Sequence, residues 1–184
     1  MDWIAKELSG ILLGDERLNK RAKIIMKNLS SSPEKNIPSA HNGWHETKAA
    51  YRFMSNENVS FEKILEVHRA STLKRLEEHQ TIILAQDTSE LNYEGQKVKS
   101  GRGPTNYKDQ RGVFLHPLLG FSDSGLCLGV LDAQVWHREA IGNREDYLTK
   151  PIEEKESFRW LEELREVNEL DSLYPDKTFV MNGC

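Results

Sequence analysis

The stretch TIILAQDTSELNY, residues 81–93, decides how the chain is organised. An apolar run of β-forming residues, Ile82 to Ala85, leads directly to a carboxylate, Asp87, and small hydroxylated residues follow it. A short apolar run of this kind is typical of a strand that is covered on both faces. An acid after a strand is more often a turn or cap residue than a catalytic one. Asp87 therefore needs further context before it indicates a function.

The sequence after this stretch predicts a hairpin, a helix and a last strand. Two apolar segments flank the turn residues FSDSG, which favours an antiparallel pair. The predicted helix places Ile152, Phe158, Leu161 and Leu164 at roughly helical spacing. The expected strands cover 112–123, 126–138 and 176–182, and the expected helix lies near 152–169.

The first eighty residues are predicted to be entirely helical. Asp15 is a good N-cap for a helix that places Leu18, Ala22, Ile25 and Leu29 on one stripe. In a later helix, apolar packing is expected of Trp44, Ala50, Tyr51 and Met54. The expected helices lie near 3–12, 16–30, 44–55 and 61–79.

Composition indicates an ordinary globular protein in a reducing location. Of 184 residues, 38% are hydrophobic and 29% are charged, which argues against wholesale disorder. No apolar run approaches the roughly 20 residues that a membrane-spanning helix needs. The first residues lack the basic-then-apolar order of a signal peptide. Two cysteines are too few for a disulfide framework. A cytoplasmic location is expected.

The net charge of −4 conceals two basic islands. Residues 1–80 carry a balance of +2 and residues 81–184 a balance of −6. One island has no acid from residue 17 to residue 33 and contains Arg17, Lys20, Arg21, Lys23 and Lys27. The other contains Lys97, Lys99, Arg102, Lys108 and Arg111, against Asp109 alone. Such islands can hold an anionic partner.

Each basic segment also has an ordinary structural interpretation. The basic helix could lie against phosphates, or it could be a solvated surface face. In KAAYRF, Lys48 and Arg52 share a helix face near Trp44, which suits nucleic acid but also a core aromatic face with snorkelling bases. The loop 97–112 could order on a polyanion or be a plain mobile loop, and it lacks the spacing of a phosphate-binding P-loop. His116 is interpreted as a satisfied core or edge histidine.

Six segments together resemble a family of bacterial transposases. They are WIAKELSGILLGDERLNKR, NGWHETKAAYRFMSNENVS, LAQDTSELNY, GVFLHPLLGF, LDAQVWHRE and EKESFRWL, in that order. In this order they resemble the insertion-sequence-four group, of which the Tn-five transposase is the familiar member. The resemblance runs from Trp3 to near the last residue.

The resemblance implies an α+β protein of two domains. A helical domain that binds the transposon end is expected over 1–80, and the first part of an RNase H-like core (strand, strand, strand, helix, strand) over 81–184. The family cuts and joins DNA with two Mg²⁺ or Mn²⁺ ions held by two aspartates and a glutamate. Hard cations prefer oxygen ligands, and a metal pair can stabilise an in-line displacement. The resemblance identifies Asp87 as the first catalytic, metal-binding aspartate.

The resemblance also implies a DNA partner, the double-stranded terminal inverted repeats of a transposon. Arg17, Arg21 and Arg52 match basic positions of the family's end-binding domain. The full set of expected DNA-binding residues is Arg17, Lys20, Arg21, Lys23, Lys27, Lys48, Arg52, Lys97, Lys99, Arg102, Lys108 and Arg111.

The sequence departs from the family pattern at its last residues. The family's fourth strand runs into a G-D-R-E motif, whereas here TFVMNG is followed by Cys184. A thiol is a soft ligand that suits Mg²⁺ poorly, and no residue matches the family's glutamate. The chain is therefore expected to be a truncated transposase that binds DNA without cutting it and binds Mg²⁺ or Mn²⁺ weakly or not at all.

Two other interpretations stay open. The chain could be an inert remnant or a regulatory fragment that occupies transposon ends or pairs with full-length transposase. It could also be a helical interaction module unrelated to DNA.

Overall fold

The computed structural model describes residues 3–93, 95, 100–107, 110–139 and 148–183. The chain forms two compact units, residues 1–71 and 72–184. Helix α5 runs through the division, because Ile64 and Val67 pack in the first core while Leu73 and Leu76 pack in the second. The boundary predicted from sequence lies a few residues later, between 80 and 81. None of the described helices is long and apolar enough to cross a bilayer.

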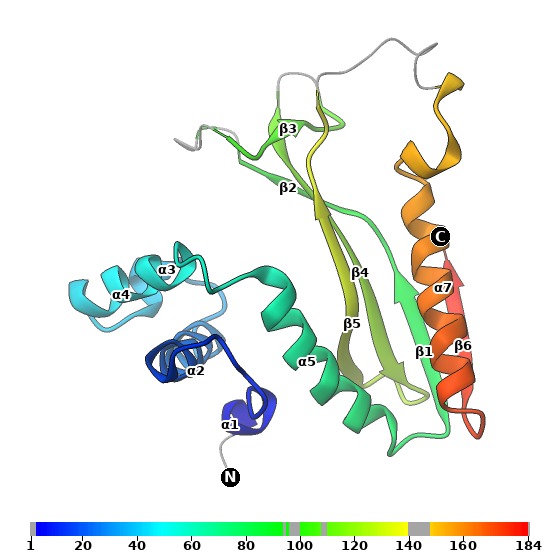
Figure 1. Cartoon of the computed structure of the whole chain (residues 1–184), viewed down its shortest axis with the longest axis horizontal. Coiled ribbons are helices and arrows are strands. Elements are labelled where there is room, and N and C mark those ends of the chain that lie inside the picture. Colours follow the sequence, from blue (N-terminus) through cyan, green and yellow to red (C-terminus); the bar gives the residue numbers. More distant parts are fainter. Residues whose placement is uncertain (1–2, 94, 96–99, 108–109, 140–147, 184) are drawn as a thin grey trace. The chain divides into compact units, whose positions relative to one another are not determined.

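The first unit is built of helices (Figure 1), as the sequence predicts. Helix α1 is shorter than expected, because the chain turns after residue 7, and a short helix at Pro38 was missed. Gly14, with a φ of 80°, supplies the left-handed residue between the first two helices. The helices are α1 (Trp3–Glu7), α2 (Glu16–Ser30), α3 (Ile37–Ala40), α4 (Trp44–Met54) and α5 (Phe61–Leu76).

The predicted stripe of α2 is confirmed, and the predicted packing of α4 is mostly wrong. Ala22 and Ile25 are buried, and Asp15 caps α2 by accepting a hydrogen bond from the Arg17 backbone N–H. In α4 the buried residues are Thr47, Ala50 and Phe53. Of the predicted residues only Ala50 is buried, because α4 turns the side that carries Thr47, Ala50 and Phe53 to the core and leaves Trp44, Tyr51 and Met54 exposed.

The second unit is a sheet covered by helix, so the α+β class is confirmed. The long β4–β5 hairpin follows the sequence prediction, and the short strands β2 and β3 are additional. The elements are β1 (Thr81–Gln86), β2 (Ser89–Asn92), β3 (Gly103–Pro104), β4 (Arg111–Ser122), β5 (Cys127–Trp136), the 3₁₀ turn η1 (Ile152–Glu154), α7 (Phe158–Leu173) and β6 (Thr178–Gly183).

Strand β1 lies inside the sheet. It pairs antiparallel with β4, with Gln86 opposite Leu118, and parallel with β6, with Gln86 opposite Gly183. The sheet order is β2-β4-β1-β6, with β3 and β5 also paired to β4. The acidic residue that follows β1 therefore lies at the end where the parallel strands β1 and β6 both finish.

One face of this sheet carries the second core. Helix α7 runs alongside β6 (Figure 1), and Val167 and Leu170 pack with Ile82 and Leu84 of β1. Strand β1 buries alternate residues only, which corrects the expectation that it is covered on both faces. Its other residues, such as Ile83, are half-buried because no described helix belongs to a core on that side.

The predicted apolar stripe of α7 is wrong. Leu161 and Leu164 are 41% and 43% exposed, whereas Glu163, Val167 and Leu170 are buried. The helix is rotated so that a carboxylate, rather than two leucines, enters the core. Glu163 is buried because it shares one face of α7 with Val167 and Leu170. These two residues continue the stripe that begins at Trp160, at helical spacing.

Candidate nucleic-acid interface

Helix α2 presents a basic face opposite its buried stripe. Lys20 and Lys27 are exposed, and Arg21 and Lys23 are half-buried beside them. None of these four side chains makes a hydrogen bond or ion pair with a described residue. Their charges are therefore available to phosphates, which bind Lys and Arg without regard to sequence.

Arg17 differs from the other bases of α2 because it has an acidic partner. Its guanidinium binds the N-cap residue Asp15, with an Nη2–Oδ2 distance of 2.7 Å. The Arg17 hydrogen bonds hold the pKa of the Asp15 carboxyl below its usual range. The Arg17 side chain is 91% exposed, and pairs exposed to this degree contribute little stability, so a phosphate can compete for this guanidinium.

Helix α4 exposes a stripe of two bases and two aromatic rings. Trp44 is 72% exposed and Tyr51 is 47% exposed, and Lys48 and Arg52 beside them are exposed too. Steps of three or four residues lead from Trp44 to Lys48 and from Lys48 to Tyr51 and Arg52, so the four share one face of the helix. The core interpretation of KAAYRF holds for Phe53, which is buried, but not for Tyr51 or for the neighbouring Trp44. Neither base has a described acidic partner.

A helix face that combines cations with exposed aromatic planes suits nucleic acid. Lysine and arginine side chains bind the phosphate backbone, while aromatic side chains can pack on sugars or nucleobases. A tryptophan exposed to this extent contributes little to the core, so packing does not explain its presence. The outer faces of α2 and α4 therefore form the candidate interface of the first unit.

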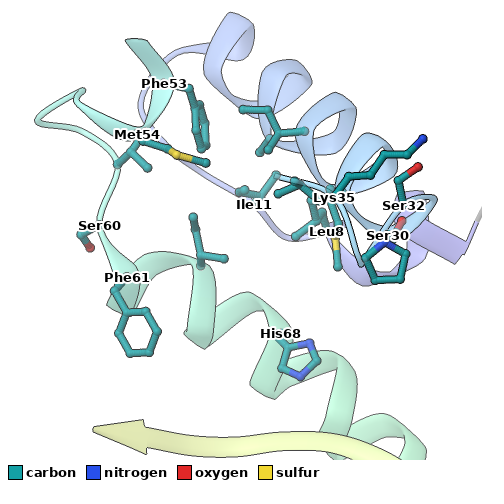
Figure 2. A pocket seen from close by; sticks show the side chains of 17 residues that line it. Leu8, Ile11, Ser30, Ser32, Lys35, Phe53, Met54, Ser60, Phe61 and His68 are labelled. Atoms are coloured by element: carbon teal, nitrogen blue, oxygen red, sulfur yellow. The ribbon is translucent and has the colours of Figure 1, made fainter. Parts of the chain in front are cut away.

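The apolar hollow of the first unit is a different feature (Figure 2). It has a volume of about 810 Å³ and is lined mainly by apolar side chains of α2, the end of α4 and α5. Phe53, Met54 and Phe61 lie toward one end, and Lys35 lies with Ser30 and Ser32 at the other. One lysine among apolar walls does not make a phosphate site.

Two residues of the second basic island are described: Arg102 directly precedes β3, and Arg111 begins β4. Arg102 donates to the Tyr93 carbonyl oxygen at 3.1 Å, and Arg111 pairs with Pro104 in the β3–β4 ladder. Lys97, Lys99 and Lys108 lie outside the described residues. The island remains a predicted DNA contact.

Asp87 is exposed and directly follows β1. Its Oδ1 accepts a hydrogen bond from the Thr88 backbone N–H at 2.7 Å. Within the described residues, no group of three or more acids, histidines or cysteines could hold a metal ion. Cys184, the predicted counterpart of a second ligand, lies outside them. Asp87 therefore remains a predicted metal ligand.

A polar cleft beside Thr88 joins two of the sequence segments named above. It has a volume of about 310 Å³ and its walls include Arg138 of WHRE and Glu156 of EKES. The Arg138 guanidinium binds the Glu156 carboxylate at 2.5 and 2.7 Å and the Asn106 side chain at 2.8 Å. Although burial opposes it, the Arg138 contact lowers the pKa of Glu156. The charged and polar groups of these residues bind one another, so we interpret the cleft as a structural contact between the two segments.

A buried carboxylate in the second unit was missed by the sequence analysis. Glu163 is 0% exposed, and neither of its carboxylate oxygens has a hydrogen-bond partner among the described residues. Burial, and then the negative charges of Asp132 and Glu166, raise the pKa of Glu163 to about 8. Its place on the stripe of Trp160, Val167 and Leu170 is the signal that could have revealed it.

Comparison with known families matches the segment that contains α1 to α4. Residues 1–59 match the family described as transposase DNA-binding. The matched segment contains α2, α4 and their exposed bases. The match supports a transposase N-terminal domain that binds DNA, in agreement with the surface of α2 and α4.

Proposed function

We propose that this chain is the N-terminal portion of a cut-and-paste transposase and that it binds transposon-end duplex DNA through α2 and α4. The observation that carries the proposal is the pairing of a basic face on α2, which has no acid after Glu16, with exposed rings and bases on α4, in the segment that matches a transposase DNA-binding family. Terminal inverted repeats are the proposed DNA partner.

The two helices supply complementary contacts. The α2 bases can bind backbone phosphates, which fixes the position of the protein on the duplex. Trp44 and Tyr51 on α4 can pack against the sugar or base surfaces that phosphate contacts do not reach. Lys48 and Arg52 add charge on the same face. This arrangement favours DNA over a helical interaction module without a nucleic-acid partner.

The second unit is proposed to be the start of an RNase H-like core of the insertion-sequence-four, Tn-five-like type. Supporting it are the order of its strands and the position of Asp87 at the shared end of β1 and β6. In this proposal Asp87 is the first oxygen ligand for Mg²⁺ or Mn²⁺. Since one carboxylate binds such ions weakly, the chain by itself is proposed not to cut DNA. The second candidate is a regulatory fragment that occupies transposon ends or pairs with full-length transposase. It is favoured by the same two properties proposed above, DNA binding by the first unit and no DNA cleavage by the chain alone.

A plasmid assay tests binding and cleavage together. The purified chain should retard supercoiled plasmid DNA and leave it supercoiled in Mg²⁺ and in Mn²⁺, because a metal pair needs several oxygen ligands. The Asp87→Ala variant should retard the DNA equally, and so should the Asp123→Ala variant, which removes an exposed acid from the β4–β5 turn. Absence of retardation would contradict the DNA-binding proposal. Nicking that Asp87→Ala abolishes and Asp123→Ala preserves would show that the site is complete.

A further inference from the structure

Both sequence neighbours of Asp87 bind the same buried histidine. His116, on β4, is 0% exposed. Its Nε2 lies 3.0 Å from Gln86 Oε1, and its Nδ1 lies 2.7 Å from Thr88 Oγ1. One imidazole ring therefore bridges the residue before Asp87 and the residue after it.

The chemistry of these partners assigns the protons. An amide oxygen such as Gln86 Oε1 can only accept, so His116 Nε2 carries the proton. In a neutral imidazole Nδ1 is then the acceptor, and the Thr88 hydroxyl donates to it. Burial lowers the pKa of His116, which favours this neutral form. The side chains of Gln86, Thr88 and His116 are thus hydrogen-bonded to one another, and none of them has a buried polar atom without a partner.

The ring that makes this bridge is itself fixed. His116 occupies the middle of β4, and the Trp160 ring of α7 meets it edge-on, with 4.9 Å between ring centroids. The bridge continues to Asp87 because the Thr88 backbone N–H donates to Asp87 Oδ1. A hydrogen-bonded chain therefore runs from the core of the second unit to an exposed carboxylate.

We propose that His116 is a positioning residue, which holds the Asp87 carboxylate in one orientation by clamping Gln86 and Thr88. The functional part of this inference rests on the proposed role of Asp87 as an oxygen ligand, whereas the clamp itself does not. An exposed aspartate at a strand end otherwise samples several staggered rotamers. A carboxylate that must present its oxygens in a defined direction gains from being held by its supporting shell.

The rotamer distribution of Asp87 tests the clamp in the full chain. Nuclear magnetic resonance couplings across χ1 of Asp87 should indicate one dominant rotamer in the wild-type protein. They should move toward averaged values in Thr88→Val and in His116→Phe, because each variant breaks the bridge. Hydrogen exchange of the Thr88 backbone N–H should be at least about tenfold faster in His116→Phe, since a freed carboxylate protects it less.

Two control variants separate positioning from general destabilisation. Thr105→Val removes another buried threonine hydroxyl of the second unit, and Leu170→Ala leaves a cavity in the second core on α7. Both should keep the wild-type couplings of Asp87. If Asp87 keeps one rotamer in folded Thr88→Val, the clamp is wrong, and this result can be obtained even where His116→Phe does not fold. Failure of DNA binding would instead contradict the proposed function and leave these couplings unchanged.

Discussion

The affinity of the chain for duplex DNA should fall about a hundredfold between 50 mM and 200 mM salt, as expected when about four phosphates are neutralised. The reason is counterion release, because each lysine or arginine that binds a phosphate frees a condensed cation. The unpaired bases of α2, together with Lys48 and Arg52, supply enough charges for this number.

Two double variants distinguish phosphate binding by α2 from a non-specific effect of the total positive charge of the chain. Arg17→Ala/Arg21→Ala should weaken binding and lower the slope of log affinity against log salt by about two. Lys150→Ala/Arg165→Ala removes the same charge from exposed positions of the second unit and should change the slope little. Fluorescence anisotropy of a labelled duplex measures both quantities. A titration that is flat in salt, or equal slopes for the two double variants, would exclude phosphate binding by α2.

The second unit should lose stability as the pH rises from about 4.5 to about 8, because of Glu163. The folded state holds a proton on Glu163 across this window and the unfolded state does not, so raising the pH favours unfolding. Below the window both states are protonated, and above it the loss is complete. A shift from 4.5 to about 8 corresponds to a loss on the order of 5 kcal/mol.

Glu163→Gln should abolish this dependence, because the amide does not titrate. The variant should be more stable than wild type by several kcal/mol at pH 9 and similar to it at pH 5. Glu169→Gln, an exposed position on the same helix, should retain the wild-type dependence. Urea unfolding of the second unit at several pH values measures the effect. Equal pH profiles for wild type and Glu163→Gln would show that Glu163 is ionised or solvated in the folded protein.

Local signals in the sequence predicted much of the fold. Helix α2 begins and ends where Asp15 and the serines after Leu29 indicate, because capping is a local property. The β4–β5 hairpin follows from two apolar segments and a turn. The short strands β2 and β3 were missed because four or two residues carry too little pattern.

The side that a helix buries was harder to predict than the helix. In α4 and α7 several apolar residues compete for the core, and tertiary packing decides which of them enter. Trp44 stays outside and Glu163 goes inside, against the usual preference of each residue type. The basic positions of the candidate interface were readily chosen because charge is visible in the sequence. The Arg17–Asp15 pair and the His116 bridge depend on side-chain geometry, which the sequence does not contain.

Mapping the contact surface on the isotope-labelled full chain tests the central claim most directly. On addition of a duplex, amide signals of α2 and α4 and the indole N–H signal of Trp44 should shift, because these groups form the proposed interface. The indole signals of Trp136 and Trp160, in the second unit, should change little at low duplex concentration. Shifts confined to the second unit, with α2, α4 and Trp44 unchanged in the presence of bound DNA, would contradict the account.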